Sequence, residues 1–225
     1  MKIRYLPALL ACVFVVAAHA DEKVSLKTQK QKFSYAVGLQ VGQSLLRQGV
    51  DLDVNAFTLA IHDVVNGAQP RLTMDELKSV LQTEQKKLLA EQAVVAKKNA
   101  AAGKKFLAEN QKKKGVVETP SGLQYEILKR GNGKKPTKDS IVTVNYRGTL
   151  IDGREFDSSA RHGKPATLQV DKVIKGWQEV LPMMSVGSKW RIFVPPQLAY
   201  GDRGAGQVIG PDETLIFDIE LLKVQ

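Results

Sequence analysis

The sequence has little cysteine and little histidine: one cysteine, Cys12, and three histidines among 225 residues. A disulfide needs a second cysteine, and zinc sites in proteins are built from clustered cysteine, histidine and acidic ligands. His62 and His162 each lack a histidine or cysteine partner at ligand spacing, so we interpret both as surface or structural residues. The composition therefore excludes a disulfide framework and favours a protein without a metal or another cofactor.

The first 20 residues differ in composition from the rest of the chain. Lys2 and Arg4 precede an apolar run over residues 6–18, and Ala18-His19-Ala20 follows. A positive start, a short apolar run and a small-x-small end are typical of a secretory signal, and the run is too short to span a bilayer with ease. We expect cleavage after Ala20 and a periplasmic mature chain. A lipoprotein signal ending before Cys12 is the alternative, and it would attach the protein to the outer membrane.

The formal net charge is +10, and the basic excess is concentrated in residues 86–114. A basic stretch can indicate nucleic acid as a partner, or it can be the solvated face of a helix. Export separates the chain from nucleic acid, so we favour the helix face and expect no nucleic acid partner. A weak attraction to anionic membrane surfaces stays open.

Residues 30–114 carry a helical pattern. Phe33, Val37, Val41 and Leu45 recur every four residues, and a second apolar periodicity follows Asp53. These segments predict an all-helical domain over residues 21–72, which we expect to pair with a second copy because so few residues make a marginal core. A compact monomeric three-helix bundle is the alternative.

A third helix is predicted over residues 73–114. The string Thr73-Met-Asp-Glu76 matches a capping box, and no proline occurs before Pro120. As one helix this segment would span roughly 63 Å, which is long enough to act as a connecting strut.

After a predicted linker over residues 115–120, the spacing of the apolar residues changes: they recur every second residue instead of about every fourth. The alternation is clear in residues 123–127, 142–146, 190–194 and 215–221, and Asp152-Gly153 signals a tight hairpin. The one plausible helix in residues 121–225 is short, from about Trp177 to Met184. The sequence therefore predicts an α+β chain whose C-terminal domain is an antiparallel sheet packed on one short helix.

Several aromatic side chains of this domain could converge. Tyr146 and Phe217 share the core-facing sides of their strands, and Trp177 can form a floor. The loop over residues 201–211 has four glycines and can bend over the same place. Its glycines lack the strand-to-helix context of a phosphate cradle. We therefore predict an apolar hollow instead of a reactive centre.

The strings SGLQY, VNYRGTLIDGREFDSS, VIKGWQE, GSKWRIFVPPQLAYG and ETLIFDIELL carry a specific resemblance. Residues 121–225 resemble an FKBP-type peptidyl-prolyl cis-trans isomerase domain. The upstream strings YAVGLQVGQSL and AFTLAIHDVVNG resemble the dimerisation domain of the bacterial macrophage infectivity potentiator group. The resemblance implies a homodimer joined by the N-terminal helices, proline-containing unfolded or flexible proteins as substrates, and macrolide inhibitors.

The resemblance also implies a set of site residues. Asp157, Tyr200, Ile174 and Trp177 would be catalytic, with Trp177 under the proline ring and the Ile174 N–H and Tyr200 hydroxyl as donors to substrate carbonyls. Ala166 stands where many relatives carry an aromatic residue, which would lower one wall and weaken macrolide binding. The implied substrate pocket comprises Tyr146, Phe156, Asp157, Val173, Ile174, Trp177, Tyr200, Ile209 and Phe217.

This site would accelerate rotation about X–Pro bonds without a covalent step. Such bonds isomerise slowly because rotation breaks amide resonance. The expected function is isomerisation in exported proteins, with chaperone activity from the cleft of the dimer. The alternative is a non-enzymatic chaperone or peptide-binding module.

Overall fold

The computed structural model describes residues 25–225. The predicted signal peptide, its cleavage site and Cys12 lie outside the described residues. The chain divides into two compact units, with the boundary between Asp53 and Val54. Within the part of the chain that is described, no helix is both long enough and apolar enough to cross a membrane.

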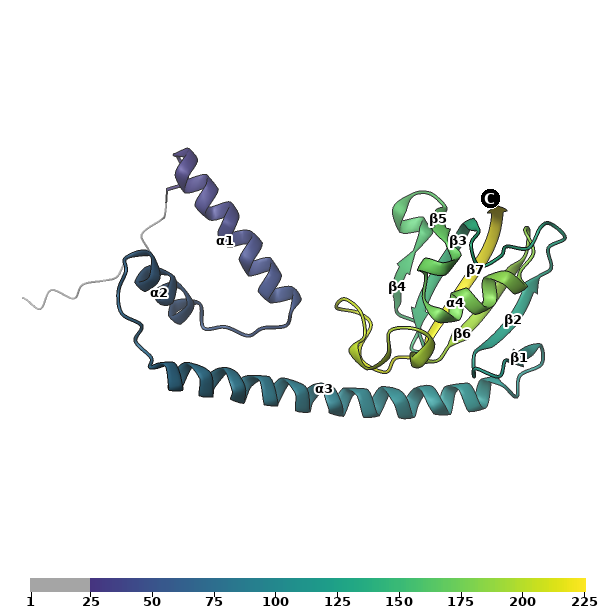
Figure 1. The fold of residues 1–225 in the computed structure, drawn as a ribbon, viewed down its shortest axis with the longest axis horizontal. Helices are drawn as coiled ribbons and strands as arrows, with labels where there is room; N and C mark the ends of the chain where they lie inside the picture. Colours follow the sequence, from purple (N-terminus) through teal and green to yellow (C-terminus); the bar gives the residue numbers. More distant parts are fainter. Residues whose placement is uncertain (1–24) are drawn as a thin grey trace, which may run out of the picture. The chain divides into compact units, whose positions relative to one another are not determined.

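The first unit contains α1 (Gln29–Arg47), labelled in Figure 1. Thr28 opens it with a capping box: its hydroxyl accepts from the Gln31 N–H, and the Gln31 side chain accepts from the Thr28 N–H. No side chain of α1 is buried, and Phe33 is 67% exposed. The apolar face predicted from the sequence is therefore present but uncovered in the single chain.

The second unit begins with α2 (Val54–Val65) and α3 (Met74–Asn110). Asp63 of α2 accepts two hydrogen bonds from the Arg71 guanidinium, at 2.6 and 3.2 Å, which ties α2 to the loop before α3. The predicted capping box of Thr73 and Glu76 is present at the start of α3. The helix ends at Asn110, four residues before the predicted end.

The C-terminal half of the second unit is a seven-stranded sheet with the strand order β1-β2-β6-β7-β3-β4, and β5 pairs with another part of β3. All the pairings are antiparallel. The predicted α+β class is confirmed. The strands are β1 (Val116–Glu118), β2 (Gln124–Lys129), β3 (Ile141–Leu150), β4 (Glu155–Ser158), β5 (Ala166–Gln169), β6 (Lys189–Val194) and β7 (Leu215–Val224).

Two local features differ from the sequence prediction. The segment predicted as a linker, residues 115–120, contains β1, which pairs with β2 and so belongs to the sheet. The short helix α4 (Lys175–Val180) starts two residues before Trp177 and passes into a 3-10 turn (Leu181–Met183). The Asp152-Gly153 hairpin joins β3 to β4 as predicted, and Gly153 takes a positive φ of 90°.

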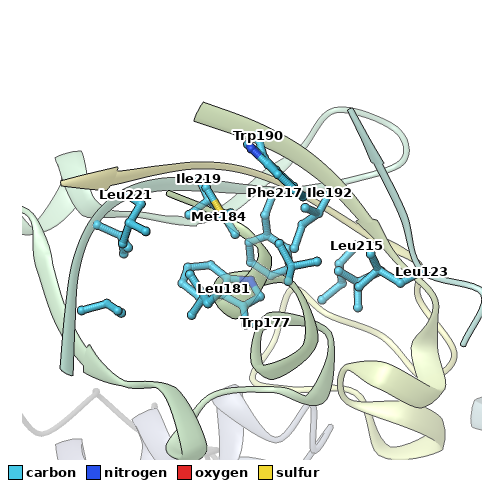
Figure 2. Close-up of a cluster of buried hydrophobic side chains, with 14 of the residues drawn as sticks. Leu123, Trp177, Leu181, Met184, Trp190, Ile192, Leu215, Phe217, Ile219 and Leu221 are labelled. Carbon is cyan, nitrogen blue, oxygen red and sulfur yellow. The ribbon is translucent and has the colours of Figure 1, made fainter. Parts of the chain in front are cut away.

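The core lies between one face of the sheet and α4, as Figure 2 shows. Alternate side chains of β3, β6 and β7 point into it, in agreement with the period of two in the sequence. Trp177, Val180 and Leu181 cover these strands from the helix side. The fully buried strand residues are Val142, Val144, Ile192, Val194, Leu215, Ile219 and Leu221.

The last turns of α3 also pack on this domain, against the other face of the sheet. Phe106 lies 5.8 Å from Phe193 of β6, measured between ring centroids. The side-chain amide of Asn99 donates to the Pro211 carbonyl at 2.9 Å. The C-terminal end of the connecting helix therefore packs on the C-terminal sheet domain, a contact that the sequence prediction did not include.

Candidate active site

A cavity of about 300 Å³ opens beside the start of α4. Its walls come from seven places in the chain: β3, β4, β5, the turn before α4, α4 itself, the residue just before the 201–211 loop, and β7. The lining residues are Tyr146, Phe156, Asp157, Leu168, Lys172, Val173, Ile174, Trp177, Tyr200 and Phe217.

Aromatic rings hold one another in fixed positions around this cavity. The Trp177 indole meets Tyr146 at 5.6 Å and 81°, and Phe217 at 5.3 Å and 84°, measured between ring centroids and planes. Phe156 meets Phe217 at 5.5 Å and 85°. Edge-to-face contacts of this kind are favourable beyond simple burial, so the rings form a preorganised apolar cup.

Ile174 offers a backbone donor at the rim. It is the N-cap residue of α4 and has extended backbone angles, and the Gln178 side chain fixes the preceding turn by donating to the Val173 carbonyl at 2.7 Å. Within residues 25–225, the Ile174 N–H has no hydrogen-bond acceptor. A donor left free beside an apolar cavity is suited to a carbonyl of a bound peptide.

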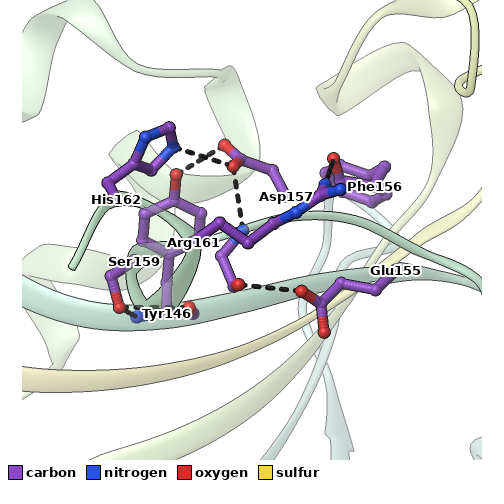
Figure 3. A network of polar contacts seen from close by, with 8 residues as sticks. Tyr146, Glu155, Phe156, Asp157, Ser159, Arg161 and His162 are labelled. Atoms are coloured by element: carbon purple, nitrogen blue, oxygen red, sulfur yellow. Dashed lines mark hydrogen bonds and ion pairs between the residues drawn. The ribbon is translucent and has the colours of Figure 1, made fainter.

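Asp157 is the charged residue at the centre of a polar network, shown in Figure 3. Its Oδ2 accepts from the Tyr146 hydroxyl at 2.5 Å, and its Oδ1 accepts from the Ser158 N–H at 2.8 Å. The His162 Nε2 lies 3.1 Å from the same Oδ1. The carboxylate thus holds the Tyr146 ring against Trp177.

The network also fixes the protonation states of its members. Partial burial opposes the charge of Asp157, but the hydrogen bonds from Tyr146, His162 and Ser158 outweigh it and hold the pKa of Asp157 below its usual value. Burial raises the pKa of Tyr146 strongly, and the hydrogen bond to Asp157 adds to this. The site therefore contains an ionised carboxylate and a protonated phenol over the ordinary pH range.

Tyr200 places a second hydroxyl at the cavity. Its side chain is 40% exposed, and within the described residues its hydroxyl has no hydrogen-bond partner. Burial of the ring edge and the charge of Asp157 raise its pKa, so the hydroxyl remains a donor. The loop that follows is closed at its base by the Asp212 N–H, which donates to the Gly201 carbonyl at 2.9 Å.

Ile209, a predicted pocket residue, is 8% exposed, packs into the core cluster and pairs with Ala205 inside the 201–211 loop. It is not among the residues that line this cavity. Leu168 and Lys172 line the cavity but were not predicted. Leu168 could have been found, because it is two residues from Ala166 and so lies on the same side of β5. It supplies a wall beside the position where Ala166 is small.

His162 is the other residue that the sequence analysis undervalued. Its sequence neighbourhood has no metal partner, and within the described residues no group of three potential ligands is close enough to hold a metal ion. Its partner is a carboxylate five residues earlier in the chain. A tight turn after β4 brings the two together, and such proximity has no periodic signal in the sequence.

Comparison with known proteins agrees with this geometry. Residues 132–222 match the sequence model of FKBP-type peptidyl-prolyl cis-trans isomerase, and residues 30–127 match that of the domain amino terminal to FKBP-type peptidyl-prolyl isomerase. The chain belongs to the FKBP-type peptidyl-prolyl cis-trans isomerases. The resemblance to the macrophage infectivity potentiator group is also confirmed.

Relatives from several bacteria match almost the whole chain. The outer membrane protein MIP of Legionella longbeachae is 44% identical over 100% of this chain and 99% of its own length. The peptidyl-prolyl cis-trans isomerase Mip of Coxiella burnetii is 40% identical with the same coverage. The crystal structure of FkpA from Escherichia coli is 34% identical and covers 89% of this chain and 99% of its own, with a TM-score of 0.62. The FKBP family assignment therefore extends over both the helical and the sheet-containing parts.

Proposed function

We propose that the cavity beside Trp177 binds the proline ring of a substrate and accelerates rotation about the preceding peptide bond. The observation that carries this proposal is the convergence of an apolar aromatic cup with two unpaired donors, the Ile174 N–H and the Tyr200 hydroxyl. A cavity of about 300 Å³ is at the small end of ligand pockets, which suits a prolyl ring with its neighbouring residue.

The proposed mechanism has no covalent step. The planar amide has more charge separation than the twisted one, so an apolar cup penalises the planar form more. The Ile174 N–H and the Tyr200 hydroxyl would hold the carbonyls that flank the rotating bond, which keeps the substrate in a turn. A millionfold acceleration would require about 8 kcal/mol from these effects together.

Asp157 would act on the same step from the side of the cup. Its carboxylate faces the cavity and holds the Tyr146 hydroxyl. We propose that it orients the aromatic wall and adds a fixed negative charge near the rotating amide.

We further propose that the mature protein is an exported homodimer whose substrates are unfolded or flexible proteins. The uncovered apolar face of α1, with Phe33 at 67% and Val37 at 44% exposure, supports pairing through the N-terminal helices. In such a dimer, the cleft between the two isomerase domains would hold unfolded clients and so provide chaperone activity. The N-terminal mass of the exported protein distinguishes a chain that starts at Asp21 from one acylated at Cys12.

The isomerase role is tested by two variants in the mature full-length chain. Tyr200→Phe removes one hydroxyl from a half-exposed ring, and Asp157→Asn removes one charge, so neither leaves a cavity in the core. We expect both to lower kcat/KM in a protease-free prolyl isomerisation assay, by about tenfold or more for Asp157→Asn. Wild-type rates in both variants would contradict the proposed roles.

The same variants separate the enzyme from the alternative, a non-enzymatic chaperone or peptide-binding module. Suppression of aggregation is measured beside isomerisation. If aggregation suppression survives in the Asp157→Asn variant, the helical region or the dimer cleft holds the client. If it is lost in parallel with isomerisation, the cavity serves both activities.

A further inference from the structure

The turn after β4 holds His162 against Asp157. This turn is a 3-10 helix (Ser159–His162), and the Ser159 hydroxyl fastens its start by accepting from the Tyr146 N–H at 3.1 Å. Gly163 ends it in the left-handed region, with a φ of 70°. Figure 3 shows the imidazole of His162 turned back onto the carboxylate of Asp157.

We propose that His162 is a positioning residue that holds Asp157 through its imidazole, so that prolyl isomerisation by this protein depends on the charge of this side chain. The inference rests on the proposed role of Asp157 in the cavity. It assigns a function to a residue that the substrate itself need not touch.

The hydrogen bonds of Asp157 show why this contact matters. Oδ2 is held by the Tyr146 hydroxyl, whereas Oδ1 has the N–H of the adjacent Ser158 and the imidazole of His162. Without His162, Oδ1 keeps only a bond within its own strand end, and the carboxylate is less constrained. His162 is thus the side chain that fixes Oδ1 from outside β4.

The charge of the imidazole decides the strength of this contact. An imidazolium donates to the carboxylate with both a hydrogen bond and a positive charge. A neutral imidazole donates from Nε2 in one tautomer, and in the other it presents a lone pair to the carboxylate. Loss of the proton therefore weakens the hold on Asp157, so that the carboxylate orients the Tyr146 side of the cup less firmly.

The groups around this pair do not change charge in the same pH range. The pKa of Asp157 and of Glu155 is lowered, so both stay ionised, and the pKa of Tyr146 and of Tyr200 is raised, so both stay neutral. Arginine and lysine side chains stay cationic. The cations of the surrounding elements are Arg147, Arg161, Lys164 and Lys172.

Two substitutions separate the charge of His162 from its shape. His162→Arg keeps a permanent cation that can donate to Asp157, and His162→Gln keeps a neutral donor. We expect kcat/KM of the wild-type protein to fall about two- to fivefold from pH 5.5 to 8, the range given by an exposed ion pair. The arginine variant should keep, at every pH, a kcat/KM close to that of the wild type at pH 5.5. The glutamine variant should keep a kcat/KM close to that of the wild type at pH 8.

The assay uses a proline-containing peptide without a coupling protease, and the mature full-length protein. His62→Gln is the matched control, since His62 is a solvent-exposed histidine on α2 that contacts Asp63 and no residue of the cavity. It should reproduce the wild-type profile. Unfolding by denaturant at each pH checks that the His162 variants are folded.

Equal and pH-independent activity of the wild type and both His162 variants would overturn the inference. If Asp157→Asn is inactive in the same series, the proposed function stands and only the role of His162 fails. If Asp157→Asn is as active as the wild type, the proposed role of Asp157 fails, and the inference fails with it.

Discussion

The side-chain amide of Asn110 donates to the side-chain oxygen of Gln124 at 3.0 Å, and each residue is only 1% exposed. The Gln124 amide nitrogen donates in turn to the Leu107 carbonyl at 2.9 Å and to Glu118 at 2.7 Å. This buried network joins the end of α3 to β1 and β2. The connecting helix is therefore fastened to the domain by polar contacts as well as by Phe106.

Asn110→Ala should lower the free energy of unfolding by about 1–3 kcal/mol, because it leaves the Gln124 oxygen buried without a donor. Equilibrium denaturation of the full-length protein measures this. Glu109→Ala, at an exposed position of the same helical turn, is the control and should change stability by less than about 0.5 kcal/mol. Equal stability of the two variants would contradict the structural role of Asn110.

Gly103→Ala should destabilise the protein, although alanine favours a helix over glycine by about 1 kcal/mol. A Cβ at this position would lie 2.3 Å from the Oγ1 of Thr214, the residue just before β7, so α3 or the Thr214 side chain would have to move. We expect a net loss of about 1–3 kcal/mol in the free energy of unfolding.

Thr214, the residue that the new methyl group would meet, provides the control for this clash. Thr214 Oγ1 is buried without a hydrogen-bond partner, so Thr214→Ala alone should cost little. The double variant should recover part of the stability, since the Thr214 Cβ would remain 3.2 Å from the new methyl group. A double-mutant cycle without coupling would contradict the predicted clash.

Gly148→Ala should impair isomerisation although Gly148 does not line the cavity. A Cβ there would lie 2.5 Å from Phe156 Cζ and 3.0 Å from Phe217 Cε1, so both rings would have to shift. We expect kcat/KM to fall about tenfold, equivalent to about 1.4 kcal/mol. Titration with a peptide ligand should show weaker binding, and unchanged kinetics would mean that the cup tolerates displacement of its rings.

Acid should remove the stabilisation that comes from the Asp157 network. The pKa of Asp157 is lowered in the folded state, so its contribution is present above the unfolded value of about 3.9 and is lost as the pH falls through the folded value. The side chain is 41% exposed, which limits the effect to less than about 1 kcal/mol.

Unfolding curves of the wild type and Asp157→Asn from pH 6 to 2 check this sign. The stability difference between the two proteins should shrink as the pH falls. A difference that stays constant or grows would show that the carboxylate is not stabilised by its partners.

The sequence predicted the sheet and the convergence of three aromatic rings because both leave regular signals, whereas the rest of the pocket was implied by the family resemblance. The period of two in residues 215–221 places Phe217 on the core side of β7, and the Thr73 capping box marks the start of α3. The positions of Tyr146, Trp177 and Phe217 at the cavity follow from the side of the strand or helix on which each residue lies. The role of each lining residue in the reaction remains a prediction.

The sequence did not predict contacts between distant segments, because the hydrophobic pattern of one segment does not show which other segment it packs against. Asn99 and Pro211 are 112 residues apart, and a polar residue on a lysine-rich helix gives no sign of burial. The same holds for Asn110, so the domain boundary was set at residue 121 although Gln124 depends on the helix. The pairing of Ile209 with Ala205, which packs Ile209 of the 201–211 loop into the core cluster, has no periodic signal in the sequence either.

Asn99, Gly103, Phe106 and Asn110 recur at intervals of three or four residues and so share one side of α3. One extra residue inserted between Asn99 and Asn110 would turn the helix by about 100° at that point and put part of this set out of phase. An insertion upstream of Asn99 would preserve the whole set. Evolution can therefore lengthen or shorten the upstream part of α3 while leaving the catalytic domain intact, and the segment 99–110 is the part whose length must stay constant.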